Sequence, residues 1–232
     1  MNSKPSRPIE KNRQKYKIAS AFVLFTIVFY SALVYISVIF GLQDDSFALF
    51  CFGIYAAAEV LSGIGIWQMI MRLRQNVAGN HKKIESAALW FLCSMFYLGA
   101  VIIAAVALTG IRASNRPETT FWGIMVSLAS ISIPIIFMTF MVKTGRELNS
   151  RELIAAGNIA TPGLFASMGL LISGFGYEFL GIGLIDSLGG LSIALSSLTK
   201  GNSALKRIRG LRTEGVAIQP AVLTSFKSQP ES

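Results

Sequence analysis

The chain contains 232 residues, of which 53% are hydrophobic and 14% are charged, and its mean hydropathy is +0.57. This composition excludes an ordinary soluble globular domain and is typical of an integral membrane protein. The formal net charge of +9 would also fit nucleic-acid binding. The basic residues, however, follow the pattern of membrane topology described below, so no nucleic-acid partner is expected.

Six long apolar segments follow one another along the chain, separated by short polar stretches. A bilayer core about 30 Å thick needs roughly 20 helical residues, and each segment is long enough to cross it. The sequence therefore predicts an all-α fold, a bundle of six transmembrane helices in a single domain. The predicted spans are residues 18–40, 47–71, 87–111, 121–142, 153–175 and 179–198.

The basic residues predict the orientation of this bundle. Nineteen of the 21 Lys and Arg residues lie in the amino tail, the second and fourth loops and the carboxyl tail, whereas the alternate loops hold only Arg112 and Arg116. Positive residues collect on the cytoplasmic side, so both termini are expected in the cytoplasm. The short loops and the absence of sorting signals favour a bacterial cytoplasmic membrane, with contacts to anionic lipid.

Three parts of the chain follow from this topology. The first apolar run is too long for a signal peptide and is therefore expected to be the first span. A basic cytoplasmic tail, residues 1–17, precedes the six-span domain, residues 18–200. A cytoplasmic tail, residues 201–232, follows it. Its first part could continue the last helix, and its last part, from residue 215, is expected to be disordered.

One acid, Glu59, lies near the middle of the second predicted span. A charged side chain at this depth costs roughly 2.5–3.5 kcal/mol, so it indicates a functional site. Tyr55 precedes Glu59 by one helical turn, which puts the phenol and the carboxylate on one helix face. This face could coordinate a cation or relay a proton. It could also be a polar pair bonded to a neighbouring helix.

The fifth and sixth spans contain further polar residues. Pro162 cannot donate a backbone hydrogen bond and crowds the carbonyl of Asn158. With Thr161, Asn158 could form a polar notch opposite Glu59, although a kink used only for packing is the alternative. Asp186 lies about two turns into the sixth span and is the second acid at membrane depth.

The remaining reactive residues favour neither catalysis nor a resident cofactor. Cys51 and Cys93 both lie inside predicted spans, where isolated thiols are expected to pack. His81 is the only histidine and lies in a cytoplasmic loop, where we expect it to be solvated. There is no nucleophile with a matching base and no phosphate-binding glycine loop, so an enzyme is not expected.

Four stretches together resemble the cation diffusion facilitator (cation efflux) family. They are "SFALFCFGIYAAAEVLSGIGIWQ" in the second span, Glu85 after "GNHKKI", "GRELNSRELIAAGNIATPG" at the fifth span and "GIGLIDSLGGLSIALSSLTKGNSAL" at the sixth. The similarity covers roughly residues 16–212 and includes the shorter six-span, zinc-linked branch of synaptic-vesicle membranes. The carboxyl tail is too short for the cytoplasmic metal-binding domain that the family carries.

The resemblance implies a transport site made of two residues from the second span and two from the fifth. Position by position these fall on Tyr55, Glu59, Ile159 and Gly163, of which the last two have no side-chain donor. Asn158 and Thr161 would then supply oxygen ligands, which favour harder ions than zinc. Asp186 would be a polar residue on the outer side or a hydrogen-bond partner in helix packing.

Two functions are therefore expected from the sequence. The first is a divergent carrier for a divalent cation, with zinc, manganese, iron and magnesium all open, exchanged for protons and dimeric by resemblance. Its metal-site residues would be Glu59, Tyr55, Asn158, Thr161 and Asp186. The alternative is a transport-inactive membrane scaffold that stabilises an active paralogue as a heterodimer, which the degenerate ligand positions would suit.

Overall fold

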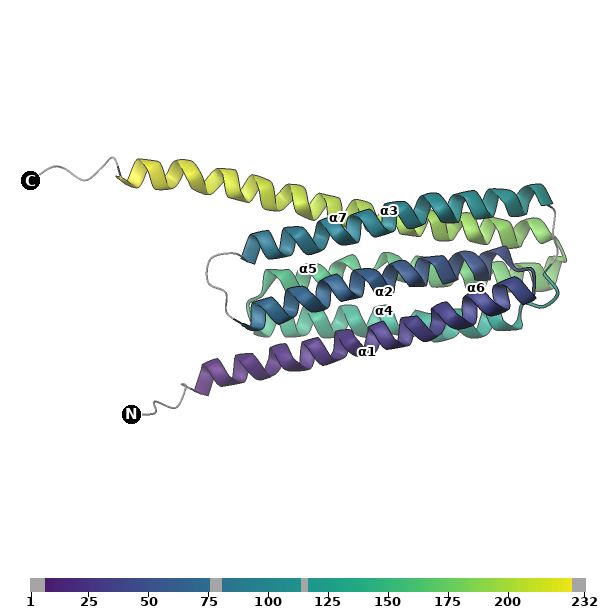
Figure 1. The fold of residues 1–232 in the computed structure, drawn as a ribbon, viewed down its shortest axis with the longest axis horizontal. Coiled ribbons are helices and arrows are strands. Elements are labelled where there is room, and N and C mark those ends of the chain that lie inside the picture. The colour runs from purple at the N-terminus through teal and green to yellow at the C-terminus, as the bar shows by residue number, and fades with distance from the viewer. Residues whose placement is uncertain (1–6, 76–80, 114–116, 227–232) are drawn as a thin grey trace, which may run out of the picture.

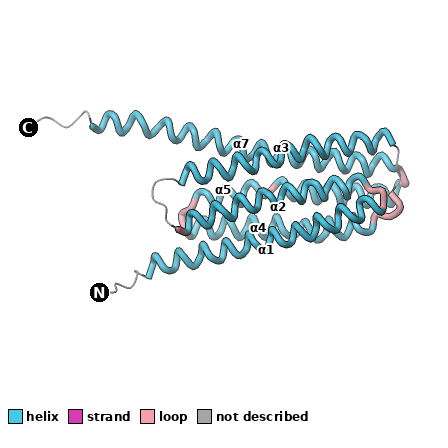
Figure 2. Tube along the Cα trace, in the orientation of Figure 1, coloured by secondary structure: helices cyan, strands magenta, loops and turns pink. Residues whose placement is uncertain are grey.

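The computed structural model describes residues 7–75, 81–113 and 117–226. In these ranges the backbone is helical apart from short connections (Figure 2). The predicted all-α fold is therefore confirmed. The helices are α1 (Arg7–Gln43), α2 (Phe47–Arg74), α3 (His81–Ala113), α4 (Phe121–Glu147), α5 (Arg151–Ile159), α6 (Pro162–Leu180) and α7 (Gly183–Phe226).

The helices lie along a common axis as an elongated bundle (Figure 1). Helix α1 begins and α7 ends at one end of this bundle, and the connection from α4 to α5 lies at that end too. The short connections from α1 to α2 and from α6 to α7 lie at the opposite end. The connections from α1 to α2 and from α4 to α5 share the same conformation just before the next helix. In each, a residue in the left-handed conformation, Asp45 (φ 52°) or Asn149 (φ 50°), precedes a capping serine, Ser46 or Ser150.

Within the described residues, five helical segments are long and apolar enough to cross a membrane. They are Gln14–Gln43, Phe47–Arg74, Lys83–Arg112, Phe121–Glu147 and Arg151–Leu180. These correspond to the first five predicted spans and indicate a multi-pass integral membrane protein. The sixth predicted span, 179–198, falls on the end of α6 and the first part of α7. Because α7 begins only at Gly183, its apolar part before Lys200 is short, and it includes Asp186.

The fifth span is divided into α5 and α6 at the position where the sequence predicts a kink. Pro162 is the first residue of α6, where its missing N–H costs nothing. The N–H groups of Ala160 and Thr161 bond to carbonyls three residues earlier, in a tightened turn. The Asn158 carbonyl accepts hydrogen bonds from the Thr161 N–H and hydroxyl, at 3.4 and 3.1 Å.

The ends of the chain differ from the sequence-based division. Helix α1 begins at Arg7, inside the predicted amino tail, and α7 continues to Phe226, through a segment expected to be disordered from residue 215. Adding one residue to an existing helix fixes few dihedral angles per new hydrogen bond, so a helix propagates more easily than it nucleates. Helix α7 therefore extends well beyond the bundle (Figure 1).

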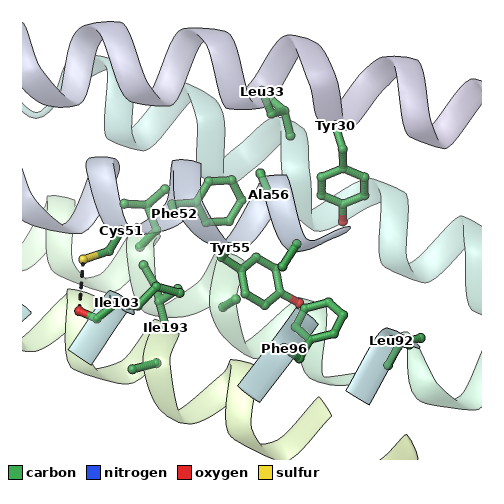
Figure 3. Packing of buried hydrophobic residues seen from close by; sticks show 14 of the residues in the cluster. Tyr30, Leu33, Cys51, Phe52, Tyr55, Ala56, Leu92, Phe96, Ile103 and Ile193 are labelled. Carbon is green, nitrogen blue, oxygen red and sulfur yellow. Dashed lines mark hydrogen bonds between the residues drawn. The ribbon is translucent and has the colours of Figure 1, made fainter. Parts of the chain in front are cut away.

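The core is centred on α2, α3 and α7. Tyr55, Phe52, Phe96 and Ile193 are almost completely buried there, and Figure 3 shows them packed together. Gly190 lets α7 approach closely, because a Cβ at this position would lie 3.1 Å from Ala107 and Cys51. Close approach of α7 to α2 and α3 is what positions the site described next.

Candidate functional site

The Glu59 carboxylate lies near the middle of α2 and is held by two groups. The Tyr55 hydroxyl, one turn earlier, donates a 2.6 Å hydrogen bond to Glu59 Oε1, as the i, i+4 spacing predicts. The Lys200 ammonium of α7 forms an ion pair with the same oxygen. The predicted pairing of the phenol with the carboxylate is thus present, and α7 adds a counter-ion.

This ion pair is almost completely removed from solvent. The Lys200 side chain is 6% exposed and the Glu59 side chain 10%. The Lys200 ammonium also lies 4.7 Å from the centre of the Phe96 ring, which is a cation–π contact. The Phe96 and Tyr55 ring centroids are 5.7 Å apart, and Figure 3 shows these rings as neighbours. The ammonium therefore contacts a carboxylate and one aromatic ring, and the Tyr55 ring packs beside that ring.

The contact between Glu59 and Lys200 depends on how α7 is aligned with α2. Asp186 accepts hydrogen bonds from Ser46 Oγ (2.9 Å) and Ala48 N (3.1 Å) where both helices begin. From there they run in the same direction (Figure 1), with equal rise per residue. The sequence separation is 140 residues for Ser46 and Asp186 and 141 for Glu59 and Lys200. The Asp186 contact and the ion pair of Glu59 and Lys200 therefore correspond, to within one residue, to the same alignment of α7 along α2.

Replacing Asp186 with alanine should lower the free energy of unfolding by about 1–3 kcal/mol, because the Ser46 hydroxyl and the Ala48 N–H lose a buried acceptor. Unfolding of the purified protein in detergent micelles measures this change. The control is Glu118→Ala, an exposed acid at the same end of the bundle, which should change stability by less than about 0.5 kcal/mol. Equal stability of Asp186→Ala and wild type would contradict the capping role.

A small cavity of about 40 Å³ lies beside the ion pair. This space can hold a few water molecules. Its wall is mainly apolar, with Ile133 and Phe137 among the lining residues. The residues that bring polar side chains to it are Thr26, Tyr30, Glu59, Ser62 and Lys200.

A wider cavity of about 460 Å³ opens between α5 and α7. Arg151, Lys206 and Arg207 give it a basic lining, and Ile159 lines both this cavity and the one beside Glu59. Arg207 also bonds Glu85 of α3 at 2.9 Å. The ion pair of Glu59 and Lys200 is thus one residue layer away from a basic, water-accessible recess.

The two fifth-span positions implied by the resemblance lie beside Glu59. Ile159 lines its cavity. A Cβ added to Gly163 would lie 3.3 Å from the Tyr55 hydroxyl and 3.5 Å from Glu59 Oε1. Neither residue carries a side-chain ligand, but both face the carboxylate across the contact of α2 with the fifth span.

The structure does not bring Asn158 and Thr161 to Glu59. Asn158 lines the basic recess and a second recess beside α4, while the Thr161 hydroxyl bonds the Asn158 carbonyl and approaches Met138 Sδ at 3.5 Å. One residue is about 100° of helical rotation, so the neighbour of a residue that faces Glu59 points elsewhere. Asp186 lies at the far end of α2 and caps it, away from Glu59.

The two cysteines named in the sequence analysis pack against neighbouring helices. The Cys51 and Cys93 thiols are buried, and each lies near a backbone carbonyl of a neighbouring helix, at 3.7 and 3.6 Å. The side chain of His81 lies outside the described residues. Among the residues that the structure describes, no group of three or more His, Cys, Asp or Glu side chains could hold a metal ion.

Sequence reasoning missed Lys200, which it placed at the end of the six-span domain and counted only as a basic residue of the cytoplasmic side, because the apolar run ends at Leu198. A long lysine just beyond an apolar run can extend along its helix. A buried acid without a counter-ion in any neighbouring span also requires a partner. Together these two signals would have indicated Lys200.

No protein-family model matches the chain, and a search of the curated proteins found no match. The resemblance to the cation diffusion facilitator family therefore stays a prediction. The site itself consists of one buried carboxylate paired with a lysine ammonium, next to a cavity. Such an arrangement can bind one cation at a time and can couple that binding to a proton.

Proposed function

We propose that this protein is a membrane carrier in which a substrate cation and the Lys200 ammonium compete for Glu59, with coupling to protons. The observation that carries the proposal is the buried pair of Glu59 and Lys200 on the wall of a cavity. A charged pair at membrane depth is costly to maintain, and such residues usually mark an ion or substrate pathway.

The need to limit the net charge of the buried site would couple binding of the substrate cation to release of a proton. In the observed state the ammonium neutralises the carboxylate, so the site has no net charge. A monovalent substrate cation that takes the place of Lys200 would leave two positive charges and one negative charge in a medium of low dielectric constant, and a divalent cation would leave one positive charge more. If Lys200 loses its proton to water in the basic recess, the site is neutral with a monovalent cation and carries one excess positive charge with a divalent cation. Return of a proton to Lys200 then releases the cation, which makes the exchange an antiport.

The proposal includes a membrane topology. Six crossing helices, including the first part of α7, would leave both chain ends in the cytoplasm, with the basic recess on that side. A bacterial cytoplasmic membrane would supply the proton gradient. Dimerisation and the divalent metal ions expected from the resemblance remain predictions, and a metal at Glu59 would have only oxygen ligands nearby.

Purified protein in vesicles that enclose a pH-sensitive dye tests the proposal. Addition of magnesium, manganese, zinc or small organic cations should move protons through the wild type and not through Glu59→Gln, which lacks the exchangeable charge. The matched control is Glu118→Gln, an exposed acid that should behave as wild type. Equal proton movement with Glu59→Gln and wild type would remove Glu59 from the mechanism.

The transport-inactive scaffold is the second candidate, and one observation favours it. Glu59 Oε1 is already bonded to both Tyr55 and Lys200, so the pair can serve simply to hold α7 against α2. This function predicts no proton movement with any of these cations. It also predicts co-purification with another membrane protein.

A further inference from the structure

The site beside Glu59 already contains an organic ammonium ion, which is that of Lys200. Its nitrogen carries the positive charge on an apolar chain of four methylene groups, paired with Glu59 and packed over the Phe96 ring. From this geometry we infer that the transported cation is a small organic ammonium ion, bound in place of the Lys200 ammonium. The inference rests on the proposed function and names its substrate class.

The aromatic side chains around the pair support this assignment. Recognition of alkylammonium ions relies on the negative faces of aromatic rings within about 6 Å of the charge, and the contribution grows when water is excluded. Phe96 lies at that distance from the ammonium and is completely buried. Tyr30 and Phe137 line the adjoining cavity. The faces of these rings attract an organic cation, whereas a metal ion would find only one ligand atom among them, the Tyr30 phenol oxygen.

The cavity wall also favours an organic ammonium ion over a divalent metal ion. Ile133, Phe137 and Ile159 are apolar and would contact the carbon groups of an ammonium ion, gaining the free energy of apolar burial. A divalent metal ion needs several N, O or S ligands. Among the described residues, no three His, Cys, Asp or Glu side chains are grouped so that they could hold one. The one carboxylate matches one positive charge.

Monovalent charge also fits the proton balance of the site. If Lys200 gives up one proton when the substrate binds, an ammonium ion with one charge leaves the site neutral. A divalent ion would leave one uncompensated positive charge at membrane depth. The exchange of one ammonium ion for one proton therefore keeps the loaded carrier and the unloaded carrier equally charged.

The test uses the full chain in vesicles with an internal pH dye, and it compares tetramethylammonium and tetraethylammonium with magnesium, manganese and zinc. Quaternary ions are chosen because they cannot cross the bilayer as neutral amines. Proton movement driven by the quaternary ions, and absent in Glu59→Gln, is the expected result. Proton movement with the metal ions alone would overturn the inference and leave the proposed carrier intact. No movement with any cation would contradict both.

A second measurement separates cation–π binding from general packing. Phe96→Leu should weaken the apparent affinity for tetramethylammonium about fivefold to thirtyfold. Phe52→Leu is the matched control, because Phe52 is an equally buried ring that also packs against Tyr55, with its centroid 6.0 Å away. This variant should leave that affinity within about twofold of wild type. Equal losses in the two variants would overturn the role assigned to Phe96.

Discussion

Replacement of Lys200 with methionine should lower the free energy of unfolding by about 3–5 kcal/mol, because it leaves the Glu59 carboxylate buried without its counter-ion. Glu59→Gln should have a cost of the same order, since it leaves a buried ammonium. The double variant, Glu59→Gln with Lys200→Met, should recover most of the loss, because a buried ion pair and a neutral pair of similar size differ little in stability. Unfolding in detergent micelles measures all three.

The ion pair of Lys15 and Glu147, which is more exposed, is the control for this cycle. Its atoms are 2.7 Å apart, but its side chains are 25% and 45% exposed. Exposed pairs contribute about 0–1 kcal/mol, so Lys15→Met should change stability far less than Lys200→Met. If the two lysine variants have equal effects, Glu59 and Lys200 do not form the buried pair on which the mechanism depends.

Replacement of Lys200 with arginine should stop transport while preserving the fold. The guanidinium group keeps the positive charge beside Glu59 but does not lose its proton in proteins. Proton movement should therefore fall to the level of protein-free vesicles, and the loss of stability should be smaller than for Lys200→Met. Dye-loaded vesicles and unfolding in micelles provide the two readouts. Wild-type flux in Lys200→Arg would contradict proton release from Lys200.

The first five membrane helices were accessible to sequence reasoning because each carries its own signal. A long apolar run predicts a span wherever its neighbours lie, and the five candidate spans match the predicted segments. The pairing of Tyr55 with Glu59 was accessible for the same reason, since both residues belong to one helix and the 3.6-residue period brings them together.

Lys200 and the fifth-span positions depend on relations between helices. The register of α7 against α2 is matched by the Asp186 contacts at the amino ends of these helices, which no local pattern in the sequence reveals. Asn158 and Thr161 do share one side of the fifth span, but Ile159 and Gly163 occupy the side that faces Glu59. Polar character alone does not determine which side of a helix meets its neighbour.

The most direct test of the account counts the protons released when a cation binds. Purified protein in weakly buffered detergent solution is mixed with saturating tetramethylammonium, magnesium, manganese or zinc, and the pH change is recorded. If a bound cation displaces the Lys200 proton, its binding releases about one proton per chain from the wild type and none from Lys200→Arg. Binding without proton release from the wild type, or equal release from both proteins, would contradict the account.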